Sequence, residues 1–312
     1  MSRTRERVVE WAVVLWVLAG MGAAEVGFRR YRDVLSGDVK HFTQMDSIVE
    51  HTASGEGLRL LVWGNSTLAQ GIDPSLLETG LEEVLRSSVT LGMIYPDGTV
   101  SLEWSYLLRK MVFLPEKLPD ALVMVLAEGN LLDRPPERSL LRLAAHHVAW
   151  EDVPRLFRED LPGFENRASF LIAKSSVTYG LRDRIAPRVF DLFIPNYRVN
   201  APILLQGPSQ LEVVGHSGPT FEYLKRILAD CRRYDLPLFV VLAPLAFDYE
   251  LEPEASELLR YAGAEIVDAR GVVPQSGELF RDAYHLNGHG RELFTEGLIT
   301  ALGDAFRTRF PD

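Results

Sequence analysis

The chain has 312 residues, of which 47% are apolar and 24% are charged, a composition typical of a globular protein with a sizeable core. Its formal net charge is −10, and because the first 32 residues carry a net charge of +3, the rest carries −13. A body this acidic, with no basic stripe, argues against nucleic acid as a partner. The one cysteine, Cys231, excludes an intrachain disulfide and a cysteine-based metal cluster, and its surroundings predict a small, half-buried thiol on a helix.

Residues 1–32 predict a membrane anchor. A charge-free stretch from Trp11 to Ala24 lies inside a longer apolar segment, which only Glu10 and Glu25 interrupt. This segment reaches the roughly 20 residues that a spanning helix needs if both glutamates lie near the lipid headgroups. Cleavage after Ala24 would make it a signal peptide instead, and arginines on both flanks leave its orientation open. We expect a retained single-pass helix over about residues 8–28.

Residues 33–57 predict a helix and linker, and an alternation of strands and helices follows. Short apolar runs, each ending at a glycine, a proline or a polar turn, predict strands at Leu58–Trp63, Ser88–Leu91, Ala121–Ala127, Pro237–Ala243 and Ala264–Val267. Helical patterns lie between them at Pro74–Leu85, Leu102–Val112, Thr220–Tyr234 and Pro253–Ala262. This order indicates an α/β fold, a parallel sheet with helices on both faces. Functional groups are then expected beyond the carboxyl ends of the strands.

The stretch from about residue 134 to residue 208 breaks this alternation. Its helix-like segments are Ser139–Val148, Arg167–Tyr179 and Leu181–Phe193, the last with a break at Pro187. Because the strand pattern resumes at Pro237, the sequence predicts a helical insertion within one domain of residues 58–312.

Two segments at opposite ends of this domain carry the groups of an activated serine. Ser66 follows the first predicted strand in Gly64-Asn65-Ser66, and Asp282 precedes His285 by three residues ahead of a final helix. In such an arrangement the serine attacks, the histidine accepts its proton, and the carboxylate orients the imidazole. Each segment also has a structural interpretation, because Ser66 could cap a helix and Asp282 could cap the turn before a surface histidine.

Two further strand ends suggest donors for an oxyanion. The amide of Gly92 and the side chain of Asn130 could join the Ser66 amide in stabilising a negatively charged oxygen. The alternatives are an ordinary turn at Gly92 and a helix cap at Asn130.

These four segments resemble the sequence blocks of the SGNH (GDSL-type) hydrolase superfamily. Ser66 matches the block I serine, in Gly-Asn-Ser where Gly-Asp-Ser is commoner, Gly92 matches block II, and Asn130 matches block III. Asp282 and His285 match block V, with the following Leu-Asn-x-x-Gly. Block III departs from the usual Gly-x-Asn-Asp, because glycine directly precedes Asn130 and the aspartate comes only at position 133.

The resemblance implies a three-layer α/β/α sandwich with a mostly parallel, flavodoxin-like sheet of five strands. It implies an acyl-ester hydrolase or O-acyltransferase that uses Ser66, His285 and Asp282 and no cofactor. With its N-terminal anchor, the chain looks most like envelope-facing members similar to the alginate O-acetylation and D-alanyl transfer proteins. That likeness implies a bacterial cytoplasmic-membrane protein with an extracytoplasmic domain, an acylated glycan or small ester as substrate, and a membrane-bound acyltransferase as a candidate partner.

Other interpretations of the sequence are weaker. Residues 215–219 resemble a Gly-x-Ser-x-Gly elbow but end in Pro219, and His285 and His289 have the spacing of a zinc pair without a glutamate between them. We therefore expect no metal. A nucleotide site would need a glycine-rich motif after a strand, which is missing. A catalytically inactive member of the superfamily, serving in envelope assembly or carbohydrate binding, stays open as the alternative.

Overall fold

The computed structural model describes residues 3–34, 37–135, 139–183, 190–191, 193–194, 197 and 220–310. These residues belong to two compact units. The first, here called the α/β unit, comprises residues 44–135 and 216–312, and the second, the helical unit, comprises residues 1–43 and 136–215. The segment predicted as an insertion thus groups with the N-terminal residues.

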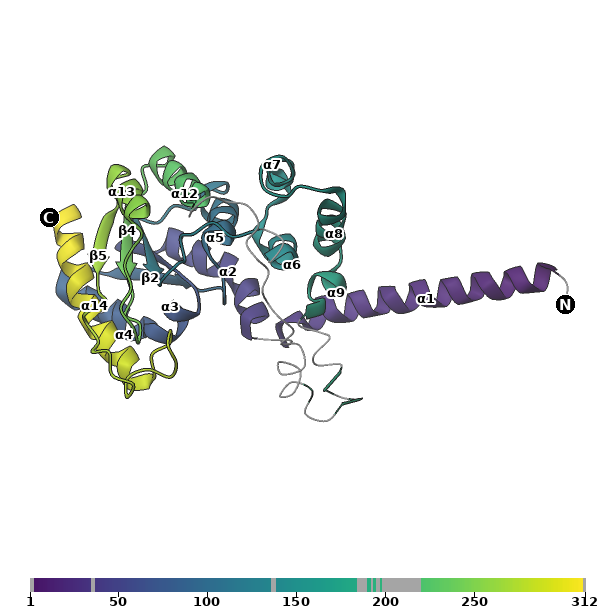
Figure 1. Cartoon of the computed structure of the whole chain (residues 1–312), viewed down its shortest axis with the longest axis horizontal. Coiled ribbons are helices and arrows are strands. Elements are labelled where there is room, and N and C mark those ends of the chain that lie inside the picture. The colour runs from purple at the N-terminus through teal and green to yellow at the C-terminus, as the bar shows by residue number, and fades with distance from the viewer. Residues whose placement is uncertain are drawn as a thin grey trace. The chain divides into compact units, whose positions relative to one another are not determined.

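The α/β unit is built on a five-stranded, wholly parallel sheet with the order β2-β1-β3-β4-β5 (Figure 1). The strands are β1 (Leu58–Trp63), β2 (Val89–Ile94), β3 (Ala121–Leu126), β4 (Leu238–Leu242) and β5 (Glu265–Asp268). All five overlap the predicted runs, although β2 continues three residues beyond its predicted end at Leu91. The order is that of flavodoxin-like sheets. The predicted α/β fold class is therefore confirmed.

Burial explains why these runs become strands. Every residue of β3 and β4 is buried, as expected for the inner strands of a parallel sheet covered on both faces. The edge strands β2 and β5 are only partly buried. On β2, two backbone amides that face away from the sheet are satisfied by glutamates of α4, because Glu82 accepts from Val89 and Glu78 accepts from Leu91, each at 3.1 Å.

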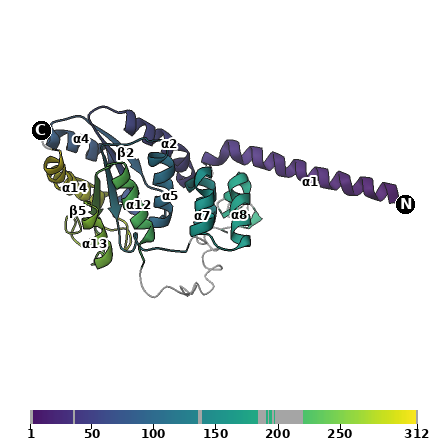
Figure 2. The same cartoon turned by 90° about the horizontal axis from the view of Figure 1, so that it is seen from above.

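Helices cover both faces of the sheet, as Figures 1 and 2 show. On one face lie α3 (Ser66–Gly71), α4 (Pro74–Leu85) and α14 (Gly288–Arg309), whose apolar side chains join those of the strands in one core. The other helices are α5 (Ser101–Leu108) with a π-helical turn η2 (Arg109–Phe113), α12 (Glu222–Arg233) and α13 (Pro253–Tyr261). The helix predicted over Leu102–Val112 thus exists but changes its hydrogen-bond spacing at Arg109.

The helical unit begins with α1 (Arg3–Tyr31), followed by a short 3₁₀ turn η1 (Arg32–Val34). Helix α2 (Gly37–Ser54) starts in this unit and ends in the α/β unit. Its further elements within the described residues are α6 (Leu140–Arg142), the π-helical turn η4 (Leu143–His147), the 3₁₀ turn η5 (Trp150–Asp152), α7 (Val153–Glu159), α8 (Phe164–Ser175) and α9 (Val177–Gly180). The break predicted at Pro187 and the segment 215–219 lie outside the described residues.

Helix α1 has the length and composition that a membrane span requires. Among the described residues it is the one helix that meets this requirement, and its apolar stretch is not buried within the molecule. A signal sequence near the N-terminus has the same properties. The expected apolar helix is therefore present, as a membrane span or a signal sequence.

An ion pair at the amino ends of β1 and β3 generates the first prediction. Two nitrogens of Arg59 donate to the two oxygens of Asp120, at 2.6 and 3.0 Å, and the Arg59 amide donates at 2.8 Å. Burial alone would raise the pKa of the Asp120 carboxyl, but the hydrogen bonds from Arg59 lower it below its ordinary value. The ionised form is therefore favoured in the folded state.

We expect Asp120→Asn to lower the free energy of unfolding by about 1 kcal/mol at pH 7. A carboxyl whose folded pKa is depressed stabilises the protein above its unfolded pKa and loses that effect as the pH falls through the folded pKa. The gap between wild type and variant should therefore shrink below about pH 4. Urea unfolding of the detergent-solubilised chain at pH 7 and pH 3 measures it. An equal gap at both pH values would contradict the ion-pair account.

Candidate active site

A chain of hydrogen bonds joins three side chains from distant parts of the α/β unit. Ser66 Oγ lies 3.0 Å from His285 Nε2, and His285 Nδ1 lies 2.8 and 2.9 Å from the two oxygens of Asp282. An ionised carboxylate only accepts hydrogen bonds, so in the neutral imidazole Nδ1 carries the proton and Nε2 accepts from the serine hydroxyl. The structure thus brings together the three residues that the sequence singled out, in the geometry of a nucleophile, a base and an orienting carboxylate.

The local structure around Ser66 leaves its hydroxyl available to the histidine. Asn65, not Ser66 or Thr67, caps α3, because its Oδ1 accepts from the Thr67 amide at 3.0 Å. The other end of the Asn65 amide donates to the carbonyl of Thr99 at 3.1 Å. Gly64 is required by a close approach, since a Cβ there would lie 2.8 Å from that of Leu68. The cap of α3 is therefore Asn65, and the alternative role for Ser66 as a helix cap is wrong.

The Asp282 carboxylate also holds the backbone of the loop that carries His285. Asp282 Oδ1 accepts from the backbone amides of Tyr284 and His285, at 2.9 and 3.0 Å, in addition to its bond to the imidazole. These bonds, first that from Tyr284 and then that from the imidazole, lower the pKa of the Asp282 carboxyl. The carboxylate thus stays ionised, as it must to orient the ring and to stabilise an imidazolium. Asn287 then caps α14 by accepting from the amides of His289 and Gly290.

Asn130 lies after β3 in a turn that fixes its amide. Its Oδ1 accepts from the Ala127 amide at 2.7 Å, and its carbonyl accepts from the Ser101 amide at 3.0 Å. Its Nδ2 makes no hydrogen bond to any residue within the described ranges, and the same holds for the Ser66 amide at the start of α3. Both groups are therefore donors whose capacity is unused.

Gly92 is not at a strand end, and this placement by the sequence is wrong. It lies inside β2 and pairs with Leu61, whereas β2 continues to Ile94. The amides of Val89 and Leu91 point away from the sheet, toward α4. Successive amides along a strand point to alternate sides, so the Gly92 amide points toward β1 and belongs to the hydrogen-bond ladder between the two strands. It is glycine because a Cβ would collide with the hydroxyl of Thr52 on α2. The structure thus gives Gly92 a packing role.

The loop after β2 approaches the serine segment instead. It includes Gly98, which has a φ of +60°, and Thr99, whose carbonyl accepts from Asn65. The strand end was predicted too early because a glycine inside a strand has the same sequence signature as a turn. The apolar residues Met93 and Ile94, directly after Gly92, were the signal that β2 continues.

Three other sequence features have different outcomes. His289 is exposed and lies 4.0 Å from Glu292. Within the part of the chain that the structure describes, no group of three or more histidine, cysteine, aspartate or glutamate residues could hold a metal ion. Cys231 lies on α12 as predicted, but it is fully buried, and burial raises the pKa of its thiol to about 12.

Comparison with known proteins finds only distant similarity. No family model matches the chain, and no curated protein matches it in sequence. An acetylxylan esterase from Geobacillus stearothermophilus superposes with a TM-score of 0.39 at 10% identity, covering 78% of this chain and 93% of that enzyme. An α/β hydrolase from the metagenome of Lake Arreo, Spain, gives 0.39 at 12% identity, with 78% and 94% covered, and a lipase from a goat rumen metagenome gives 0.36 at 12%, with 78% and 96% covered. Similarity this low carries no argument about activity.

The position of Gly92 generates a stability prediction. We expect Gly92→Ala to lower the free energy of unfolding by about 1–3 kcal/mol, because the added methyl group overpacks the contact with α2. Removing the obstructing hydroxyl in a Gly92→Ala/Thr52→Ala double variant should recover part of that loss. Thermal unfolding of both variants measures it, with Thr52→Ala alone as the matched control. A Gly92→Ala protein as stable as wild type would refute the packing role.

Proposed function

We propose that this chain is a serine-dependent acyl-ester hydrolase or O-acyltransferase that works through an acyl-enzyme. The single observation that carries the proposal is the continuous hydrogen bonding from Ser66 through His285 to Asp282. An unactivated serine is a weak nucleophile, and a base in contact with its hydroxyl is what makes it reactive. The matching positions of Ser66, Asn130, Asp282 and His285 further support membership of the SGNH superfamily as part of the proposal.

The reaction follows from the geometry. Ser66 Oγ attacks the acyl carbonyl carbon while His285 Nε2 takes its proton, and the carbonyl electron pair moves to the oxygen. Asp282 stabilises the imidazolium that forms. The tetrahedral intermediate then collapses, the bond to the leaving alcohol breaks, and His285 returns the proton to that alcohol. His285 then deprotonates a second hydroxyl, from water or from an acceptor alcohol, as its oxygen bonds the acyl carbon. The bond between that carbon and Ser66 Oγ breaks, and His285 returns the proton to Ser66 Oγ.

The oxyanion requires donors, and the proposal assigns two. They are the Ser66 amide and the Asn130 side-chain amide, since both are unused among the described residues. Removing one such donor typically costs on the order of a hundredfold or more in rate. Gly92 is not one of the proposed oxyanion donors, because it pairs with Leu61 inside the sheet and its amide belongs to the hydrogen-bond ladder.

The exposure of the site supports an ester carried on a larger molecule. The Asp282 and His285 side chains are 48% and 20% exposed, and Tyr284 between them is 45% exposed. A reacting group so near the surface can be reached by an acyl group on a polymer. Because α1 can anchor the chain in a membrane, we propose a cell-envelope or extracellular glycan as the acyl carrier and an extracytoplasmic location for the α/β unit. Whether water or a sugar hydroxyl resolves the acyl-enzyme distinguishes hydrolysis from transfer.

Replacing the nucleophile tests the proposal. Ser66→Ala should lower kcat/KM for an aryl acetate by at least about 10³-fold and should abolish acetate release from an O-acetylated glycan. The matched control is Ser75→Ala, which removes a hydroxyl from an exposed serine on the next helix. Release is followed by absorbance for the aryl ester and by enzymatic acetate assay for the glycan. Undiminished turnover by Ser66→Ala would remove this residue from the mechanism.

Replacing the carboxylate of Asp282 tests whether it orients His285. Asp282→Asn should lower kcat/KM for the aryl acetate by about 10³-fold, because an amide cannot hold the imidazole in the required tautomer or stabilise its charged form. Asp304→Asn, an exposed aspartate that pairs with Arg307 on α14, is the control and should leave kcat/KM unchanged. A loss below about tenfold in Asp282→Asn would show that the carboxylate does not support the base.

A further inference from the structure

Helix α8 of the helical unit exposes an apolar stripe. Phe164, Leu171 and Ile172 are 86%, 40% and 51% exposed. Their spacing along the helix places them on one face, together with Ala168, while Phe170 lies on the opposite, buried face. Helix α8 is thus apolar on its buried face and on its exposed face. An exposed apolar face of this kind is unfavourable in water and often marks a contact with a partner or a membrane.

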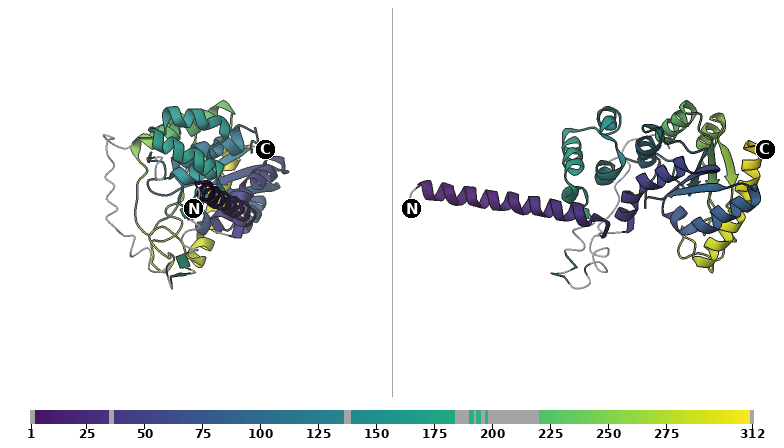
Figure 3. Two further views of the ribbon diagram at one scale, coloured as in Figure 1. Left: turned by 90° about the vertical axis from the view of Figure 1, so that its right-hand side faces the viewer. Right: turned by 180° about the vertical axis from the view of Figure 1, so that it is seen from behind.

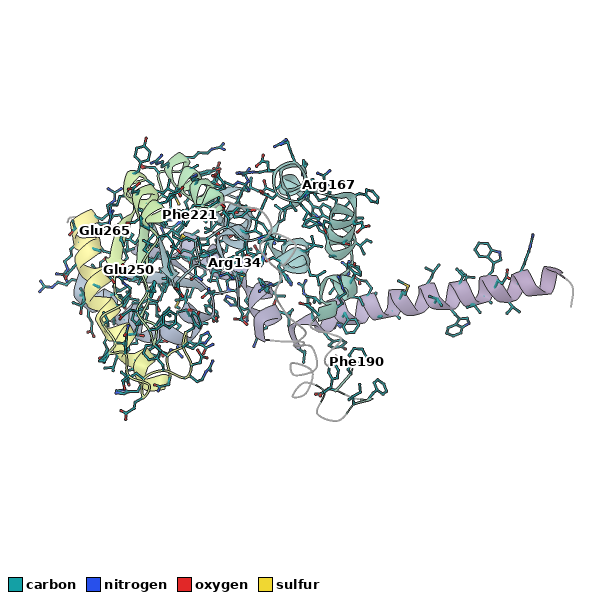
Figure 4. All side chains as sticks on the ribbon, in the orientation of Figure 1. Arg134, Arg167, Phe190, Phe221, Glu250 and Glu265 are labelled. Atoms are coloured by element: carbon teal, nitrogen blue, oxygen red, sulfur yellow. The ribbon has the colours of Figure 1, made fainter. Side chains whose placement is uncertain are left out.

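The two cations of α8 face the interior of the helical unit. Arg167, labelled in Figure 4, donates to the carbonyls of Leu161 and Phe157. Lys174 donates to the carbonyl of Val148 at 2.6 Å and lies 4.8 Å from the centre of the Trp150 ring. Glu165 is therefore the charged residue left at the exposed side of the helix. The stripe is consequently not the usual solvated face of a surface helix.

The C-terminal part of α1 is fixed to α8 and α9 by charged hydrogen bonds. The Glu25 carboxylate accepts from the amides of Val177 and Thr178 at the start of α9, at 2.7 and 3.0 Å. Arg29 donates to the carbonyl of Ser175 at the end of α8, at 2.9 Å, and to Glu25 at 2.8 Å. We call this set the α1 clamp. It sets the depth of α8 relative to any bilayer that α1 crosses.

The length of α1 sets that depth. All sixteen residues from Val8 to Ala23 are exposed, and partial burial against the rest of the helical unit begins at Ala24. Sixteen helical residues extend about 24 Å, less than the roughly 30 Å of a bilayer's hydrocarbon core. Residues 24–28, which contact the helical unit, must therefore lie at the edge of the apolar layer. Figures 1 and 3 show the N-terminal part of α1 projecting from the side of the helical unit on which α8 lies, so α8 lies near this edge.

We propose that the outer face of α8 lies in the headgroup–acyl boundary of the bilayer that α1 spans. The occupant of the stripe is thus lipid, and the helical unit is part of the anchor. The proposal rests on α1 being retained as a membrane span and is independent of the esterase proposal. Exposed cations near the clamp, Arg30, Arg32 and Arg182, suit lipid phosphates.

An environment-sensitive probe on the stripe tests this placement. Leu171→Cys in the full chain is labelled with a nitrobenzoxadiazole fluorophore and reconstituted in nanodiscs of phosphatidylcholine and phosphatidylglycerol. Its emission should shift to the blue and should be quenched at least about twofold more by doxyl-labelled lipid than that of a labelled Arg158→Cys control on α7, with the reverse order for aqueous iodide. Wild type, whose one cysteine is Cys231, measures background labelling, which should be low because that thiol is buried and burial raises its pKa. Equal quenching of both sites by iodide, with none by lipid, would overturn the proposal.

A second variant tests the clamp. Glu25→Ala in the Leu171→Cys background should lose most of the lipid quenching, because α8 is no longer fixed to α1. Circular dichroism of the same sample checks that the helices persist. Undiminished lipid quenching with intact helices would overturn the role assigned to the clamp. Since neither readout measures turnover, a failed esterase proposal would leave these outcomes unaffected.

Discussion

The hydrogen bond between Ser66 Oγ and His285 Nε2 is the contact on which the functional account depends. It joins residues 219 positions apart, and the parallel sheet makes it possible. In such a sheet every strand ends at the same edge, so the loop after the inner strand β1 and the loop before α14 can meet there. Two local sets of hydrogen bonds, around Asn65 and around Asp282, then position the serine and the histidine. Asn65 frees the serine by capping α3 in its place, and Asp282 binds the backbone of the loop whose imidazole it orients.

The two units of the chain have different tasks in this account. The α/β unit has a continuous apolar core in which α3, α4 and α14 pack on the sheet, and this rigid base supports the serine and the histidine. Helix α8 of the helical unit has an exposed apolar stripe instead, and its two cations, Arg167 and Lys174, face inward. A helix whose outer face is in water usually shows the reverse distribution. Helix α1 belongs to the same unit, in which Glu25 and Arg29 of α1 bind the backbone of α8 and α9. The proposed contact with lipid fits this grouping.

The sequence predicted the sheet well because the physical signals there are local. The run Leu58–Trp63 and the helix Pro74–Leu85, with its proline after a capping aspartate, have the same bounds in the structure. The prediction failed at Gly92 because a glycine within a strand cannot be told from a turn by sequence alone. Here the glycine is needed for packing, since any side chain at position 92 would collide with Thr52 of α2. The Glu25 contacts could not be predicted either, because their partners lie about 150 residues away.

The most direct test of the central claim is covalent labelling of the detergent-solubilised chain with a fluorophosphonate, followed by peptide mass spectrometry. The reagent forms a phosphorus–oxygen bond, with loss of fluoride, only at a serine whose hydroxyl is activated by a base. The account predicts a single adduct on the peptide that contains Ser66 and no adduct in a His285→Ala variant. An unlabelled wild-type chain, or an adduct at another serine that persists in the His285→Ala variant, would contradict it.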